Sequence, residues 1–159
     1  MNPKLRKMLQ SGRRCAEYVA PVAALLTRLA YGKQFIVTGW GKWTHLDNLT
    51  QFFTTLGLPF PRANAMLVAT VELVGGPCLI LGLGTRLFAA LLSTTMVVAI
   101  FTADRAETFA AFSWSGDLTN SEKVTSFVCL MALLWLVGYG AGPVSVDRQI
   151  ARNLAKEGS

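Results

Sequence analysis

The stretch that decides the fold is residues 62–83, RANAMLVATVELVGGPCLILGL, a run of apolar and small residues interrupted by one carboxylate, Glu72. A helix needs about 20 apolar residues to cross about 30 Å of hydrocarbon, so this run is long enough to span a membrane. A second run, residues 18–41, is also long enough but contains Arg28 and Lys33. Charged side chains at bilayer depth are costly, and they mark functional or helix-pairing sites.

Two shorter apolar runs, residues 87–103 and 124–139, bring the number of candidate spans to four. Only 15% of the 159 residues are charged, whereas about 25% are charged in a typical soluble domain. We therefore predict an all-α integral membrane protein whose four spans form a bundle. The membrane domain covers residues 18–142, between a basic segment, residues 1–17, and a tail, residues 143–159.

The net charge of +6 is distributed in a way that predicts topology. Nine basic residues lie on one side: before the first span, after the last span and, in the case of Arg86, in the short second connection. Four basic residues lie on the opposite side. The positive-inside rule then places both termini in the cytoplasm. The basic ends are expected to contact anionic lipid head groups, and this arrangement argues against nucleic-acid binding.

The two connections on the outer side are predicted to be structured. In residues 42–61, four apolar residues recur at nearly helical spacing, which favours an amphipathic helix on the outer membrane surface. Thr44 and Asp47 have the spacing of a capping box for it. A loop packed over the mouth of the bundle is the alternative. Residues 104–123 are long for such a connection and contain Trp114, which favours a lid or binding loop.

The buried charges are the candidate site. Arg28 lies ten residues after Tyr18, and Glu72 lies ten after Arg62. At 1.5 Å per residue both are about 15 Å deep, so we expect an Arg28–Glu72 ion pair. One hypothesis is that this pair only joins two helices. The other is a polar pocket for a quinone-like or anionic ligand, or a proton relay, lined by Arg28, Glu72, Lys42 and Asp104.

Metal binding and self-contained catalysis are not predicted. His45 is the single histidine, and no second soft ligand stands near it in the sequence. The three cysteines form no C-x-x-C motif. No Cys–His or Ser–His–Asp set is present either, so any redox chemistry would need a cofactor or a partner protein.

Four stretches in this order and spacing resemble the DoxX family of small four-span bacterial membrane proteins. They are residues 25–32 (LLTRLAYG), 39–42 (GWGK), 72–86 (ELVGGPCLILGLGTR) and 140–147 (GAGPVSVD). The likeness extends from about Leu25 to Asp147. Family members often have histidines where this chain has Thr38 and Asp104. The pattern positions carried by this chain are Gly32, Gly39, Gly41, Gly75, Gly76, Thr85, Arg86 and Asp147.

The resemblance implies a four-helix bundle in the bacterial inner membrane, and some family members are linked to sulfur-compound and quinone oxidoreduction. Our leading hypothesis is an accessory subunit of a membrane redox system that binds a quinone or small anion between spans one and two. Arg28 and Glu72 would set the charge of that pocket. The alternatives are a non-enzymatic scaffold or assembly factor and a small-solute transporter. A redox partner protein and self-association into a homo-oligomer are the expected interactions.

Overall fold

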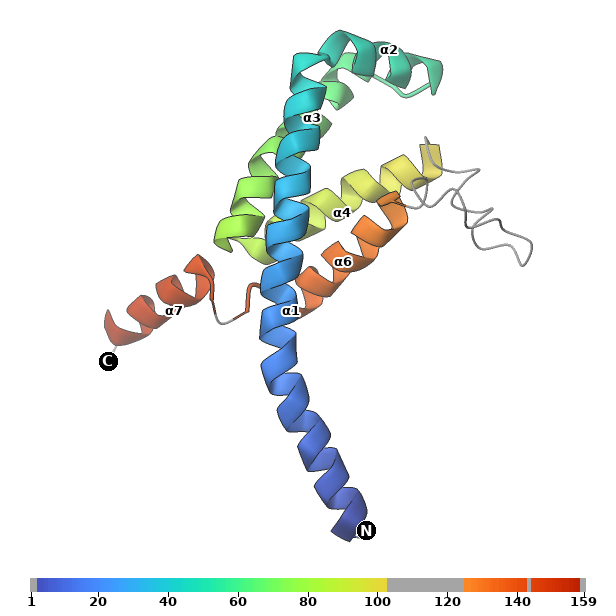
Figure 1. The fold of residues 1–159 in the computed structure, drawn as a ribbon. Coiled ribbons are helices and arrows are strands. Elements are labelled where there is room, and N and C mark those ends of the chain that lie inside the picture. The colour runs from blue at the N-terminus through green and yellow to red at the C-terminus, as the bar shows by residue number, and fades with distance from the viewer. Residues whose placement is uncertain (1–2, 103–124, 143, 158–159) are drawn as a thin grey trace, which may run out of the picture.

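The computed structural model describes residues 3–102, 125–142 and 144–157, with side chains for residues 18–102, 125–142 and 144–156 (Figure 1). Its helices, in chain order, are α1 (Pro3–Thr44), α2 (Leu46–Thr55), α3 (Pro61–Leu81), α4 (Thr85–Thr102), α6 (Thr125–Tyr139) and α7 (Val146–Glu157). The described part of the chain contains helices and no strands, which confirms the all-α prediction. The predicted lid, with Asp104 and Trp114, lies outside the described residues.

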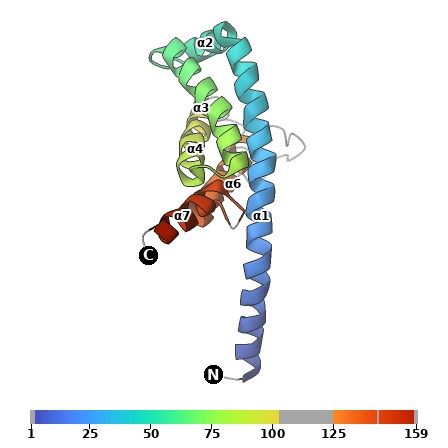
Figure 2. The same ribbon diagram turned by 90° about the vertical axis from the view of Figure 1, so that its left-hand side faces the viewer.

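Two of the described helices, α3 and α4, are long and apolar enough to cross a membrane, and α6 is a shorter apolar helix. Helix α1 is much longer than the span predicted over residues 18–41, because it begins at Pro3 and continues for 42 residues. Its N-terminal part extends away from the other helices in both views (Figures 1 and 2). Leu, Lys, Arg, Met and Gln dominate its first two turns, and all are good helix formers.

Helices α1 and α3 pack closely because glycines lie where they meet. A Cβ atom on Gly39 would lie 2.6 Å from the backbone nitrogen of Leu73, and one on Gly76 would lie 2.7 Å from the carbonyl oxygen of Gly32. Both distances are too short for any side chain, so glycine permits backbone-to-backbone contact as at other membrane helix interfaces. The contacts pair later residues of α1 with earlier residues of α3, so the two helices are antiparallel.

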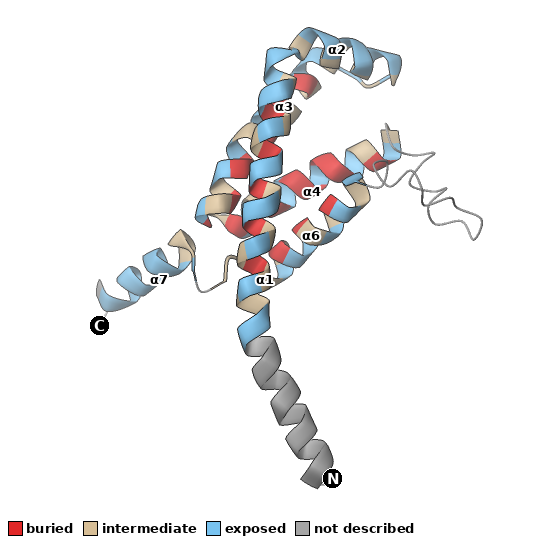
Figure 3. Ribbon diagram, in the orientation of Figure 1, coloured by how far each residue is buried: buried red, intermediate tan, exposed pale blue. Residues whose placement is uncertain are grey.

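Helices α4 and α6 form a second pair beside the first (Figures 1 and 2). The two pairs meet where a Cβ atom on Gly75 of α3 would lie 3.0 Å from the Leu92 side chain of α4. Buried residues follow the facing sides of the helices (Figure 3). The core consists of Ala24, Phe35, Leu79, Ala89, Leu92, Met96, Cys129, Leu133 and Leu136. Many large apolar side chains point outward instead, as expected of surfaces that face lipid.

The amphipathic helix predicted within residues 42–61 is present as α2, which packs against α3 at the far end of the α1–α3 pair. Its predicted capping box is wrong. The N-cap residue is His45, which makes no side-chain capping bond, and the Thr44 hydroxyl bonds the carbonyl oxygens of Trp40 and Gly41. The reason is that α1 continues to Thr44, so this hydroxyl belongs to the last turn of α1.

Candidate functional site

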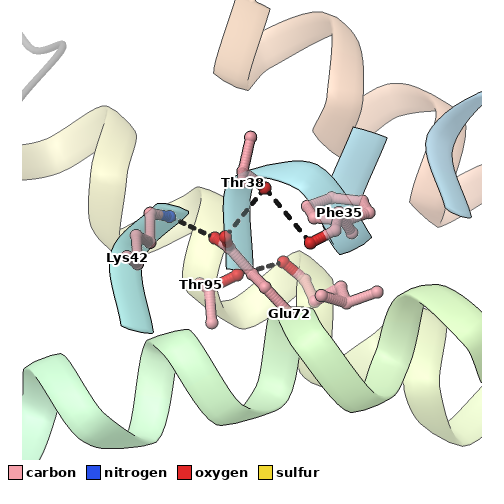
Figure 4. A network of polar contacts seen from close by, with 6 residues as sticks. Phe35, Thr38, Lys42, Glu72 and Thr95 are labelled. Carbon is pink, nitrogen blue, oxygen red and sulfur yellow. Dashed lines mark hydrogen bonds and ion pairs between the residues drawn. The ribbon is translucent and has the colours of Figure 1, made fainter. Parts of the chain in front are cut away.

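Glu72 is the centre of a polar cluster between α1 and α3. Its carboxylate is almost completely buried, with 1% of the side chain exposed. One oxygen forms an ion pair with Lys42 Nζ at 2.5 Å, and the other lies 3.0 Å from the Thr38 hydroxyl (Figure 4). That hydroxyl also lies 3.3 Å from the Phe35 carbonyl oxygen, so its single proton is shared between two acceptors. Glu72 is therefore paired and hydrogen-bonded on both oxygens.

Lys42 connects this buried carboxylate to the outside of the helix pair. Its side chain is 31% exposed, so one end of the ion pair is accessible and the other is enclosed. A buried charge is tolerated in an apolar environment when a partner compensates for the lost hydration. Lys42 therefore has a specific interaction and is more than a head-group anchor at the rim of the bundle.

Helix α4 also contributes a side chain near Glu72. Thr95 of α4 lies beside the carboxylate in Figure 4, with its hydroxyl bonded to the Leu92 carbonyl oxygen at 2.8 Å. Cys129 of α6 is buried in the core cluster to which Phe35 of α1 and Leu92 of α4 also belong. The carboxylate thus lies where the α1–α3 pair meets the α4–α6 pair.

A cavity of about 400 Å³ lies between α1 and α6. Its lining combines apolar and polar groups: Ala30, Tyr31, Gln34, Thr125, Val128 and Cys129. Tyr31, Gln34 and Thr38 recur along α1 at i, i+3 and i+7 spacing, which puts them on neighbouring parts of one helix face. A polar stripe therefore runs along α1 from the cavity toward the Glu72 carboxylate.

The position of this cavity differs from the predicted one and extends the site. A pocket was predicted between the first two spans, whereas this cavity lies between α1 and α6, and the backbones of α1 and α3 are in close contact at Gly32 and Gly39. Sequence reasoning also missed Tyr31, Gln34 and Cys129. The helical spacing of Tyr31 and Gln34 with Thr38 was a usable signal in the sequence. No sequence pattern indicated that Cys129 would line the cavity from another helix.

The predicted Arg28–Glu72 ion pair is wrong. Arg28 is 1% exposed, and its guanidinium bonds four backbone carbonyl oxygens at a separate place. Nε donates to Leu79 at 2.8 Å and Nη2 donates to Ile80 at 2.9 Å, both at the C-terminal end of α3. Nη1 donates to Ala141 at 2.5 Å and to Val144 at 2.8 Å, in the segment after α6. Arg28 therefore ties two chain segments together and compensates the negative end of the α3 dipole.

The error came from the assumed ends of the spans. Counting from residues 18 and 62 placed both charges at the same depth, but the glycine contacts set a different register. Gly39 lies against Glu72 and Leu73, and Gly32 lies against Gly76 and Ile80. Arg28, one turn before Gly32, is consequently level with the end of α3.

Asp147, in the first turn of α7, stabilises the turn between α3 and α4. Its carboxylate oxygens accept hydrogen bonds from the backbone nitrogens of Gly84 at 2.7 Å and Thr85 at 3.1 Å, and so cap the first turn of α4. Its own backbone nitrogen donates to the Gly82 carbonyl oxygen at 3.1 Å. Gly82 has a left-handed φ of 71°, which ends α3. Arg28 and Asp147 thus fix one turn between them.

Three further pattern positions are Thr85, Arg86 and Gly41. Thr85 is fully buried, and its hydroxyl has no hydrogen-bond partner among the described residues. Arg86 lies against Gly140, which has a left-handed φ of 83°. Because glycine has no side chain, the guanidinium can approach the backbone there. Gly41 is exposed, and a Cβ atom there would contact nothing within 4 Å.

The chain has significant sequence similarity to known membrane proteins. The DoxX family profile matches residues 23–105. The chain is 36% identical over 81 residues to the protein named Putative oxidoreductase CatD from Bacillus subtilis, a match that covers 51% of this chain and 59% of that protein. It is 26% identical over 129 residues to Inner membrane protein YphA from Escherichia coli, which covers 81% of this chain and 91% of that protein. No solved structure matches it significantly.

Proposed function

The chain belongs to the DoxX family of membrane proteins, and we propose that it is an accessory subunit of a membrane redox system that binds a quinone-type ligand beside Glu72. We further propose that α1, α3, α4 and α6 span the bacterial inner membrane as a four-helix bundle with both termini in the cytoplasm. The basic N-terminal and C-terminal ends support this orientation. The similarity to a protein named for the inner membrane supports the location.

The observation that carries the proposal is a buried, paired carboxylate approached by a polar stripe from a cavity. Structural ion pairs do occur inside membrane proteins, but ionisable residues there are functional candidates by default. The cavity of about 400 Å³ lies within the size range of small-molecule sites. Its described lining comes from two helices, α1 and α6, and includes the apolar side chains of Ala30 and Val128.

The polar groups favour a quinone over a small anion. Lys42 is already paired with Glu72, and none of the described residues that line the cavity is a cation that would attract an anion. Tyr31 and Gln34 instead supply a hydroxyl and an amide, which donate hydrogen bonds to carbonyl oxygens. A quinone ring has two such oxygens and an apolar body that suits Ala30 and Val128.

A partner is required for electron transfer in this proposal. The described residues include no group of three or more His, Cys, Asp or Glu side chains that would hold a metal ion. The role of this chain would be to bind and position the quinone, while a partner protein carries the redox centre. The name of the Bacillus subtilis relative, an oxidoreductase, supports a redox context.

The test is equilibrium binding of a short-chain quinone analogue to the full chain in lipid nanodiscs. We expect saturable binding that is weakened about tenfold or more by Tyr31→Phe combined with Gln34→Leu, because each substitution removes a hydrogen bond worth about 1 kcal/mol. Tyr18→Phe with Gln51→Leu is the matched control, since both residues are exposed and distant from the cavity. Equal binding by the two double variants would contradict the site, and no binding by the wild type would contradict the ligand.

A second substitution separates this function from that of a scaffold. Replacing the ion pair by Lys42→Met and Glu72→Leu removes two charges together and is expected to preserve the fold. A scaffold would retain its assembly with partner proteins and its activity in the cell. A quinone-binding subunit would assemble but lose quinone-dependent activity, because the polar end of its site is gone.

A further inference from the structure

The last helix, α7, has the pattern of a helix that lies in a membrane surface. Val146, Ile150 and Leu154 recur every four residues, and Arg148, Arg152 and Lys156 recur two positions later, about 200° around the helix. Ile150 and Leu154 are 46% and 63% exposed, so the described residues leave this part of the apolar stripe uncovered. An exposed apolar stripe opposite a basic stripe is typical of interfacial helices.

The start of α7 is fixed to the end of the transmembrane helices. The bonds of Asp147 to Gly82, Gly84 and Thr85 hold its first turn against the turn between α3 and α4. From there α7 extends sideways from the helix pairs (Figures 1 and 2). A helix that leaves the bundle where its spans end lies at the level of the lipid head groups.

At the base of α7 is a cavity of about 530 Å³ with two arginines in its lining, Arg86 and Arg148. Neither forms an ion pair with another described residue. The carboxylate in the lining, Asp147, is occupied by two backbone N–H groups. Gly140 supports this arrangement because a side chain there would press on the Arg86 guanidinium: its Cβ would lie 3.1 Å from Nε. The cavity is therefore positively charged.

We propose that this cavity binds the phosphate of an acidic phospholipid, with α7 lying on the same leaflet. The two guanidinium groups match a phosphodiester, because arginine donates paired hydrogen bonds to phosphate oxygens. Leu87 and Tyr139 give the lining an apolar part, which suits the start of an acyl chain. These apolar contacts favour a lipid over free phosphate. The site is separate from the cavity beside Glu72 and does not depend on the quinone proposal.

The test is native mass spectrometry of the full chain in detergent, titrated with phosphatidylglycerol or with phosphatidylcholine of the same acyl chains. We expect the wild type to bind the acidic lipid at least fivefold more tightly. Arg86→Gln with Arg148→Gln should weaken that binding about 25-fold, since each basic residue near a lipid surface contributes about 1 kcal/mol, or about fivefold. Arg62→Gln is the matched control, because it removes an exposed arginine at the opposite end of α3.

Other outcomes of this experiment would overturn the proposal. Equal affinity for the two lipids would show that the site does not recognise acidic head groups. Displacement of the lipid by equimolar inorganic phosphate would assign the site to the free ion instead. If the double variant does not elute as a folded protein, Arg148→Gln alone and Arg86→Lys replace it. Arg148→Gln should weaken lipid binding about fivefold, whereas Arg86→Lys should retain most of the binding. Equal losses in both variants would contradict a charge-based site.

Discussion

Replacing Arg28 with methionine tests whether this buried charge is structural. Methionine fills the place of the apolar stem of arginine but removes the donors to four carbonyl oxygens. The Leu79 oxygen retains a hydrogen bond from the Gly82 nitrogen, so the oxygens of Ile80, Ala141 and Val144 are the three that lose the arginine as their donor. An unsatisfied buried carbonyl costs about 1–3 kcal/mol. Water reaches the partly exposed segment after α6, so we expect a total loss of about 3–5 kcal/mol of unfolding free energy.

The measurement is equilibrium unfolding by SDS in mixed micelles, followed by helical circular dichroism. Arg28→Lys should lose about half as much as the methionine variant, because an ammonium group keeps the charge but lacks the planar, five-donor geometry of arginine. Lys33→Met is the control, since Lys33 is exposed one turn away on the same helix. It removes one positive charge without removing a buried hydrogen bond.

Two results would refute this reasoning. If Arg28→Met loses less than about 1 kcal/mol, or no more than Lys33→Met, the guanidinium contacts do not stabilise the fold. If the double variant of Arg28 and Glu72 shows coupling well above the ~0.5 kcal/mol expected of independent sites, the two charges interact after all. The structure predicts near-additive effects because the two side chains have no shared partner.

Three other substitutions give further expected outcomes. Gly39→Ala should destabilise the α1–α3 pair by about 1–3 kcal/mol through overpacking, whereas the control Gly41→Ala should be neutral or slightly stabilising by thermal unfolding. Asp147→Ala should cost about 0.5–2 kcal/mol in the same assay, because α4 loses its N-terminal cap. Lys42→Met should cost about 3–5 kcal/mol because it leaves the buried Glu72 carboxylate unpaired. A second change, Glu72→Leu, should restore stability, and failure of that rescue would contradict the pairing.

The all-helical fold was predictable because its signals are local. Apolar runs of membrane-spanning length stand out in residues 62–83 and 87–103, and α3 and α4 occupy nearly these ranges. The amphipathic spacing in residues 42–61 likewise indicated α2. The start of α1 was missed because an apolar run marks only the part of a helix that lies in lipid, whereas the helix itself continues into a basic segment.

The partners of the buried charges could not be predicted, because they depend on the register between helices. Sequence identified Arg28 and Glu72 as buried charges, and both are buried. Which residues lie opposite them is decided by the contacts of Gly32 and Gly39 with α3. A charge can also be satisfied by backbone carbonyls, as Arg28 is, and carbonyl groups are present at every position of a sequence. Side-chain pairing rules therefore had no means of finding this solution.

The most direct test of the proposed function is photo-crosslinking with an azidoquinone, followed by peptide mapping of the labelled full chain. We expect adducts on α1 near Ala30–Gln34 and on α6 near Thr125–Cys129, both suppressed by excess unlabelled quinone. Adducts confined to the lipid-facing sides of α3 and α4, or adducts that unlabelled quinone does not suppress, would contradict a quinone site between α1 and α6.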